Sequence, residues 1–267
     1  MTLLLVGLLI LLALLGLPLF VALAGGSLLA TYNAGLDPAL LAVELNRLAS
    51  SPHLAAIPLF TFAGVILAAG GAPQRMIQLF NASVGWLPGG MAGVAIASCA
   101  FFTAFSGASG VTILALGGLM FPMLLHAGYK ERFTLGLLTT SGSLGLLFAP
   151  SLAILLYGIV AGVSIDQLFL AGIVPGFLLM LMLGLYALYI GRKADIPRHT
   201  FSVAALGSAL REGAWDILLP VGILTGIFGG YVTITEASAC TAVYVLILEG
   251  IIHREVHLIR HLPALLR

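Results

Sequence analysis

Charged residues are scarce in this sequence. Asp, Glu, Lys and Arg make up only 8% of its 267 residues, whereas a soluble domain carries roughly 25%. Hydrophobic residues reach 61%, and mean hydropathy is +1.16. A soluble fold of this size has no means of burying so much apolar surface, whereas a bilayer accepts it as helices of about 20 apolar residues each. The composition therefore excludes a soluble protein and predicts an all-α, multi-pass membrane protein.

Several functional classes are excluded by what else is missing. Net charge is only +1, so the sequence offers no strongly basic surface for nucleic acid. The two cysteines, Cys99 and Cys240, lie in apolar stretches, where a thiol behaves as a small hydrophobe. No phosphate-binding loop or metalloprotease helix motif occurs, and no serine or cysteine has an evident base partner. We therefore predict no enzymatic activity, no organic cofactor and no nucleic-acid partner.

Ionisable residues are nearly absent from the predicted spans, which argues against coupling through a buried carboxylate or histidine. Glu236 is the candidate exception, and we interpret it as a capping carboxylate with Thr233 as the N-cap. An alternative is a metal site, because four potential ligands recur at i, i+4 spacing. These are Glu249, His253, His257 and His261. They lie among charged residues at a membrane boundary, where polar side chains are expected, so we predict no transition-metal site.

The N-terminal region contains short apolar segments. Residues 2–32 as one helix would be about 45 Å long, against a hydrocarbon core of roughly 30 Å. Because Pro18 removes a backbone donor, we favour two short spans, 2–15 and 18–32, over one long span. Residues 33–51 are predicted to lie at the interface, and residues 53–71 to cross the membrane. Residues 74–86 are predicted to form a surface helix that carries Arg75, with Trp86 as its interfacial anchor.

Two later segments are interrupted near their centres. Residues 87–126 contain a Ser/Gly-rich stretch at 106–110, which predicts a re-entrant hairpin of two helices of about 16 residues that meet deep in the membrane. Residues 133–163 contain a proline break at 145–151, which interrupts the helical hydrogen bonds and frees carbonyl groups. The remaining predicted spans are 165–191, 214–228 and 237–252.

Basic residues orient these segments. The stretch 192–212 carries Arg192, Lys193, Arg198 and Arg211, and the positive-inside rule places it in the cytoplasm. The hairpin at 87–126 then enters and leaves from the cytoplasmic side. Five crossings and one hairpin, followed by a restart in the opposite orientation, are typical of an inverted-repeat transporter.

The two interruptions are the candidate functional elements. In transporters of this kind, half-helix N-termini face anionic groups, while unwound carbonyls and hydroxyls coordinate sodium. The alternative is close packing, because Gly and Ser also let helices approach one another. The two interruptions in tandem favour a ligand site.

Several motifs in this chain resemble the large membrane subunit of TRAP transporters, the tripartite ATP-independent periplasmic family. The resemblance covers nearly the whole chain but only roughly the first three fifths of a usual family member. The motifs occur in the family's order. They are Leu54-Ala55-Ala56-Ile57-Pro58-Leu59-Phe60, Leu87-Pro88-Gly89-Gly90, Phe105-Ser106-Gly107-Ala108-Ser109, Ala127-Gly128-Tyr129, the break at 142–151, Ala161-Gly162-Val163-Ser164, Leu170-Ala171-Gly172-Ile173-Val174-Pro175-Gly176 and Thr233-Ile234-Thr235-Glu236-Ala237.

This resemblance implies the inverted-repeat elevator fold of the ion-transporter superfamily, with the first repeat and the start of the second. The implied parts are scaffold helices at 1–72, an interfacial arm helix at 73–86, a transport domain at 87–163 made of the hairpin 87–126 and the broken helix 133–163, a transmembrane helix and cytoplasmic loop at 164–212, and the start of the second repeat at 213–267.

The resemblance also implies sodium-coupled uptake of small organic acids, chiefly carboxylates, across the bacterial inner membrane. The implied sodium site consists of Thr103, Ser106, Gly145, Phe148 and Pro150, with Na⁺ as the coupling ion. Ser109 and Gly110 are the candidate substrate contacts. The implied partners are a small membrane subunit and a periplasmic solute-binding protein.

Some family features are changed or missing. Ala149 stands where the family often has a second proline, and Ile234 replaces the proline common between the two threonines. The second hairpin, its broken helix and the second sodium site are absent from this sequence. We therefore expect a transporter subunit whose second repeat is supplied by a separate chain or whose sequence is truncated here. The alternative is a truncated or remnant permease that has only a structural or assembly role.

Overall fold

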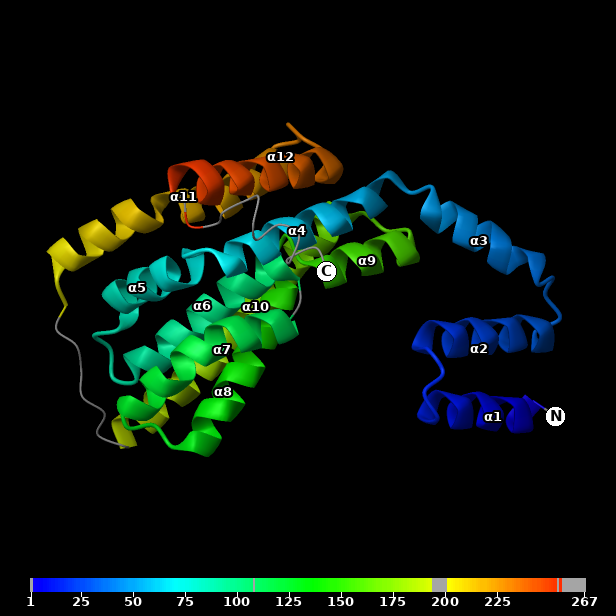
Figure 1. Ribbon diagram of the computed structural model, residues 1–267, viewed down its shortest axis with the longest axis horizontal. Coiled ribbons are helices and arrows are strands. Elements are labelled where there is room, and N and C mark those ends of the chain that lie inside the picture. The colour runs from blue at the N-terminus through cyan, green and yellow to red at the C-terminus, as the bar shows by residue number, and fades with distance from the viewer. Residues whose placement is uncertain (1, 108, 194–200, 254, 256–267) are drawn as a thin grey trace. The chain divides into compact units, whose positions relative to one another are not determined.

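The computed structural model describes residues 2–107, 109–193, 201–253 and 255, and within these ranges every regular element is a helix (Figure 1). The chain divides into two compact units, residues 1–51 and residues 52–267. The predicted all-α class is confirmed for the described part of the chain.

The first unit contains three helices, α1 (Thr2–Leu14), α2 (Leu19–Asn33) and α3 (Ala39–Ala49). Helices α1 and α2 pack against each other, and Gly25 of α2 faces the Leu9 side chain of α1. Between them, Gly16 has a φ of 102°, which glycine adopts without steric cost, and Pro18 precedes α2. The prediction of two short helices in place of one long helix is confirmed.

The second unit contains the remaining helices. They are η1 (Pro52–Ala55), α4 (Ala56–Ala69), α5 (Ala72–Val84), α6 (Gly90–Ser106), α7 (Ser109–His126), α8 (Glu131–Leu144), η2 (Gly145–Leu147), α9 (Leu152–Ala161), α10 (Ile165–Lys193), α11 (Val203–Phe228), α12 (Ile234–Ile247) and η3 (Leu248–Ile252), the last of which is a π-helical turn.

Helix α6 lies at the centre of this unit. It packs against α4, α5, α7, α8 and α10, while α12 packs on α4 and α11 packs on α5 (Figure 1). Most of its residues are small, and Ala92, Ala95, Ser98 and Cys99 are fully buried. Small side chains let neighbouring helix backbones approach closely, which suits a helix that is enclosed on several sides.

Within the described residues, four helical segments are long and apolar enough to cross a membrane: Pro52–Ala69, Ser109–His126, Ile165–Lys193 and Ile234–Ile252. A fifth candidate is the pair Glu131–Leu147 and Leu152–Ala161, which is bent by 45° at the break between them. Helix α11 is longer than predicted, because it begins at Val203 within the segment expected to be a cytoplasmic loop. Residues 194–200 of that segment lie outside the described residues.

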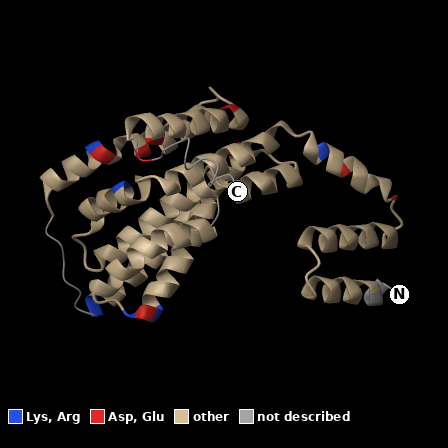
Figure 2. Ribbon diagram, in the orientation of Figure 1, with Lys and Arg blue, Asp and Glu red and all other residues tan. Residues whose placement is uncertain are grey.

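Charged residues gather near the ends of the central helices (Figure 2). The Phe133 ring at the start of α8 lies 5.8 Å from the Tyr186 ring near the end of α10. The basic residues beside these two positions therefore lie at one end of the bundle, in agreement with the prediction that both are on one side of the membrane. These residues are Lys130, Arg132, Arg192 and Lys193.

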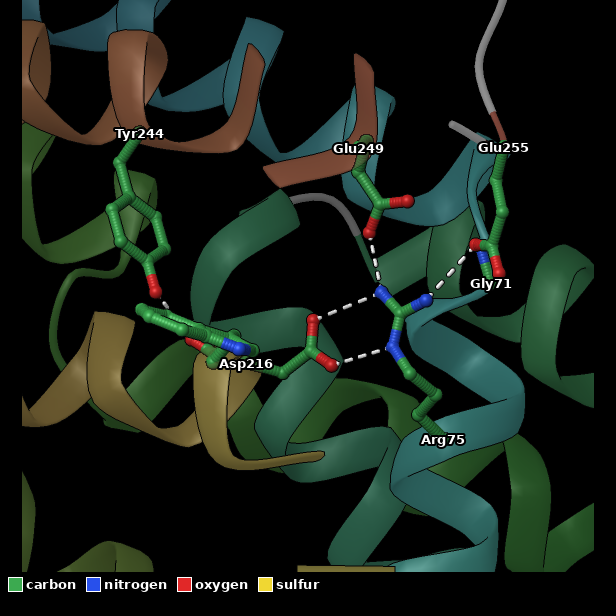
Figure 3. A network of polar contacts seen from close by, with 7 residues as sticks. Gly71, Arg75, Asp216, Tyr244, Glu249 and Glu255 are labelled. Atoms are coloured by element: carbon green, nitrogen blue, oxygen red, sulfur yellow. Dashed lines mark hydrogen bonds and ion pairs between the residues drawn. The ribbon is translucent and has the colours of Figure 1, made fainter. Parts of the chain in front are cut away.

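Two expectations about charged residues are wrong. Arg75 was expected on a surface helix, yet it is only 8% exposed and forms ion pairs with Asp216 and Glu249 (Figure 3). Asp216 and Glu249 lie in predicted spans but are buried, at 3% and 0% exposed. The prediction that Glu236 was the main ionisable exception overlooked Asp216 and placed Glu249 at a membrane boundary, because a buried ion pair can keep charged residues inside apolar segments.

Candidate functional site

The first helix break separates α6 from α7. Helix α6 ends at Ser106, and Gly107 adopts a left-handed conformation with a φ of 61°, in which its N–H donates to the Thr103 carbonyl at 2.8 Å. Glycine is favoured there because other residues meet steric strain at positive φ. The break predicted at 106–110 is therefore present, and the chain reverses direction at this point (Figure 1).

The second break separates α8 from α9. Helix α8 ends at Leu144, a 3₁₀ turn follows, and residues 148–151 have no helical assignment before α9 begins at Leu152. The Ala149-Pro150 peptide bond is cis. The Phe148 N–H donates to the Gly145 carbonyl at 3.1 Å. The helix interruption predicted at 145–151 is therefore also present.

The two breaks touch each other. A side-chain carbon placed on Gly107 would collide with Leu152, the first residue of α9. One placed on Gly145 would collide with the Ala100 carbonyl and with Thr103 of α6. The ends of four half-helices, the C-termini of α6 and α8 and the N-termini of α7 and α9, thus meet in one region.

Buried hydroxyl groups line this region. Thr103 is fully buried, and its Oγ1 donates to the Gly142 carbonyl of α8 at 2.8 Å, which joins the two broken elements directly. Ser106 is 3% exposed, and its Oγ lies 3.0 Å from Thr112 Oγ1 of α7. A hydroxyl that donates one hydrogen bond keeps acceptor lone pairs. Both side chains can therefore also offer oxygen to a cation.

The other residues predicted for the site lie at its edges. Pro150 is buried, whereas Phe148 is half-buried with its ring against Gly176 of α10. Ser109 is half-buried at the start of α7, and its carbonyl lies close to Gly142. Gly110 is exposed and has open space beside it.

Two buried hydroxyls at the breaks were missed by the sequence reasoning. Thr112 of α7 is fully buried and contacts Ser106. Ser151 precedes α9 and is fully buried, and its Oγ has no hydrogen-bond partner among the described residues. A buried hydroxyl without a partner is costly unless something else satisfies it. The sequence signal that could have identified Ser151 is its position inside the predicted break at 145–151.

The predicted capping role of Glu236 is confirmed. Thr233 Oγ1 accepts from the Glu236 N–H, and Glu236 Oε2 accepts from the Thr233 N–H at 2.8 Å. Of the alternative metal ligands, Glu249 is paired with Arg75, and His257 and His261 lie outside the described residues.

Comparisons with known proteins connect this geometry to a family. The family model described as the tripartite ATP-independent periplasmic transporter, DctM component, matches residues 6–267. The chain is 38% identical over 213 residues to the C4-dicarboxylate TRAP transporter large permease protein of Vibrio cholerae. This alignment covers 79% of this chain and 47% of the relative.

Two further relatives align over more of the chain. The ectoine/5-hydroxyectoine TRAP transporter large permease protein of Ruegeria pomeroyi is 34% identical, covering 93% of this chain and 59% of the relative. The C4-dicarboxylate TRAP transporter large permease protein of Rhodobacter capsulatus is 33% identical, and the alignment covers 97% of this chain and 62% of the relative. The chain therefore spans about half to three fifths of the length of these curated relatives.

Proposed function

Because the chain belongs to the DctM component family of tripartite ATP-independent periplasmic transporters, we propose that it is part of a sodium-coupled permease that takes up small organic acids across the bacterial inner membrane. The family match confirms the resemblance inferred from the motifs. It also identifies the chain as a multi-pass membrane protein from a family of transporters, whose curated relatives are permeases and not enzymes.

The contact between the two helix breaks is the observation that carries this proposal. Helix breaks inside a membrane are tolerated where the freed backbone groups are enclosed by protein or line a polar site. Here the end of α8 packs on α6 through Gly145, and Thr103 bonds to the Gly142 carbonyl. Paired breaks in contact are the arrangement that transporters use for ion and substrate sites.

Sodium is the proposed coupling ion because the region offers neutral oxygen donors. Hard cations bind carbonyl and hydroxyl oxygens in preference to softer ligands. The proposed ligands are the five residues predicted from the sequence: Thr103, Ser106, Gly145, Phe148 and Pro150. Thr112 and Ser151 are added as neighbours of this site. The unpartnered buried Oγ of Ser151 supports a ligand at this break.

The proposed substrate is a small organic acid that binds beside the sodium ion. The N-termini of α7 and α9 begin at the two breaks, and helix N-termini favour negative charge. Ser109 and Gly110, on the first turn of α7, remain the proposed substrate contacts. Relatives are described as permeases for C4-dicarboxylates, isethionate and ectoine, all of which carry a carboxylate or sulfonate group, and this supports a substrate with an acid group.

The proposed transport step is an elevator movement, in which the elements of residues 87–163 slide as a transport domain through the scaffold. We propose that a small membrane subunit and a periplasmic binding protein complete the system. This chain spans only part of its relatives' length, and we propose that the second repeat is supplied by further sequence of this protein or by another chain. A remnant with a purely structural role is the alternative.

Uptake by the complete assembly in proteoliposomes tests the proposal. With the binding protein and a matched carboxylate present, we expect uptake under a sodium gradient to fall roughly tenfold or more when potassium replaces sodium, since loss of about 1.4 kcal/mol of driving force already changes an equilibrium tenfold. Equal uptake in both ions would contradict sodium coupling. Uptake in neither ion, from an assembly that is intact by size-exclusion chromatography, would favour the remnant.

A further inference from the structure

A buried charge cluster lies apart from the two helix breaks. It joins α5 to α11 and to the end of α12, and we call it the Arg75 cluster, comprising Arg75, Asp216, Glu249 and Glu255 (Figure 3). Arg75 comes from α5, Asp216 from α11, Glu249 from the π-helical turn after α12, and Glu255 from the residues that follow. The proposed sodium site makes no use of these residues.

Charge is not balanced in the Arg75 cluster. One guanidinium faces three carboxylates, and Asp216 and Glu249 are almost wholly removed from solvent. Among the described residues, His253 is the other basic side chain near the cluster, and its charge lowers the pKa of Glu255. Helix α4, which packs against α12, carries no titratable side chain that faces the cluster. A buried carboxylate without full compensation favours its neutral form.

The three carboxylates are not equally well satisfied. Asp216 binds Arg75 through both oxygens, at 2.7 Å from Nε and 3.2 Å from Nη2. Glu255 is 42% exposed and accepts from Arg75 Nη1 and from the Gly71 N–H. Although burial raises the pKa of Glu255, the Arg75 charge and these hydrogen bonds outweigh it, so its pKa lies below its usual range. Glu255 is therefore held in its ionised form, and both oxygens of Asp216 accept hydrogen bonds from Arg75.

Glu249 has the fewest partners. Its Oε1 accepts from Arg75 Nη2 at 2.5 Å, but its Oε2 is buried and has no hydrogen-bond partner among the described residues. Oε2 points at Gly70, where a side-chain carbon would collide with it. No donor among the described residues thus reaches this oxygen, and leaving a charged oxygen buried without a donor costs more than leaving a neutral one.

We propose that Glu249 is a proton-binding site, and that at neutral pH the Arg75 cluster holds a proton on Glu249 while Asp216 and Glu255 stay ionised. The proton neutralises one of the two buried carboxylates, so that the Arg75 charge is matched by Asp216 inside the protein. The site lies where α5 meets α11 and α12, and it neither requires nor excludes the proposed sodium coupling. The inference therefore goes beyond the proposed function and does not rest on it.

Infrared spectroscopy of the purified chain in detergent micelles tests this proposal, because a protonated carboxyl group has a C=O stretch that is well separated from the bands of a carboxylate. At about pH 7 an ordinary glutamate, with a pKa of about 4.3, is ionised. We expect the unaltered chain to show a protonated carboxyl band at that pH. We also expect Glu249→Gln to lose the band and Glu44→Gln to keep it, since Glu44 is an exposed partner of Arg47.

Absence of the band from the unaltered chain, or its persistence in Glu249→Gln, would overturn the proposal. If Glu249→Gln does not fold, the unaltered chain labelled with ¹³C at the glutamate carboxyl carbons provides the second measurement. The band must then move with the glutamate label and stay in place with an aspartate label. A band that moves only with the aspartate label would place the proton on Asp216 and contradict the assignment to Glu249.

Discussion

Replacement of Arg75 by alanine is expected to lower the free energy of unfolding by about 3–5 kcal/mol, because removal of one partner from a buried ion pair leaves the other charge without compensation. The substitution removes four hydrogen bonds from the guanidinium to carboxylates, two of them to Asp216. Burial lowers the pKa of Arg75, but its pairing with Asp216 and Glu249 outweighs burial and keeps the pKa above its ordinary value. The side chain is therefore charged in the folded protein.

The matched control is Arg47→Ala. Arg47 is paired with Glu44 at 2.7 Å, but both side chains are at least half exposed. Exposed pairs contribute about 0–1 kcal/mol, so the expected loss is small. Denaturant or thermal unfolding of both variants in the same detergent provides the comparison. Similar small losses in the two variants would show that Arg75 is solvated in the protein and that the buried Arg75 cluster is wrongly described.

Gly145→Ala is the second change for which we expect a large effect. A β-carbon at this position would lie 2.5 Å from Thr103 Cβ and 2.7 Å from the Ala104 backbone nitrogen, and it would also meet the Ala100 carbonyl. The backbone of α6 cannot yield as a flexible side chain does, so α8 must move away from α6. Overpacking of this kind costs about 1–3 kcal/mol. Because the shift separates the two breaks, we expect uptake by the complete assembly to fall by roughly tenfold or more.

Gly136→Ala in α8, the helix that ends just before Gly145, is the control. Apart from the chain neighbours and the backbone of its own helix, no described atom lies within 4 Å of the corresponding β-carbon, and the residue is exposed and helical. Alanine there should leave stability unchanged or raise it by about 0.5–1 kcal/mol, since alanine favours helix more than glycine does. The unfolding free energy and the initial uptake rate are measured for both variants. Wild-type uptake by Gly145→Ala would show that close contact between α6 and α8 is not needed for transport.

Local sequence signals predicted the helix breaks well. Pro18 with Gly16, the Ser/Gly-rich stretch that contains Gly107, and the proline break that contains Pro150 are all interruptions in the structure. Each depends on backbone chemistry within a few residues, so no tertiary information was needed. The capping box of Thr233 and Glu236 was predictable for the same reason.

Contacts between distant segments could not be predicted in this way. Arg75 and Asp216 are 141 positions apart, and Arg75 and Glu249 are 174 apart. In isolation each residue resembles a charge at a membrane boundary, because arginine and glutamate are common there. Only the packing of α11 on α5, together with that of α12 on α4 and α11, brings the three together. The buried state of Ser151 likewise depends on tertiary packing around the break.

The sodium dependence of uptake by Ser106→Ala and Ser27→Ala tests most directly whether the helix breaks hold the coupling ion. Each change removes one hydroxyl, but Ser106 is buried at the first break, whereas Ser27 is in α2 and bonds to the Leu23 carbonyl of its own helix at 2.8 Å. For Ser106→Ala in the complete assembly we expect half-maximal uptake to need roughly ten times more sodium, which corresponds to loss of about 1.4 kcal/mol of binding energy. Ser27→Ala should match the unaltered protein. An identical sodium dependence in both variants would contradict the assignment of Ser106 to the sodium site.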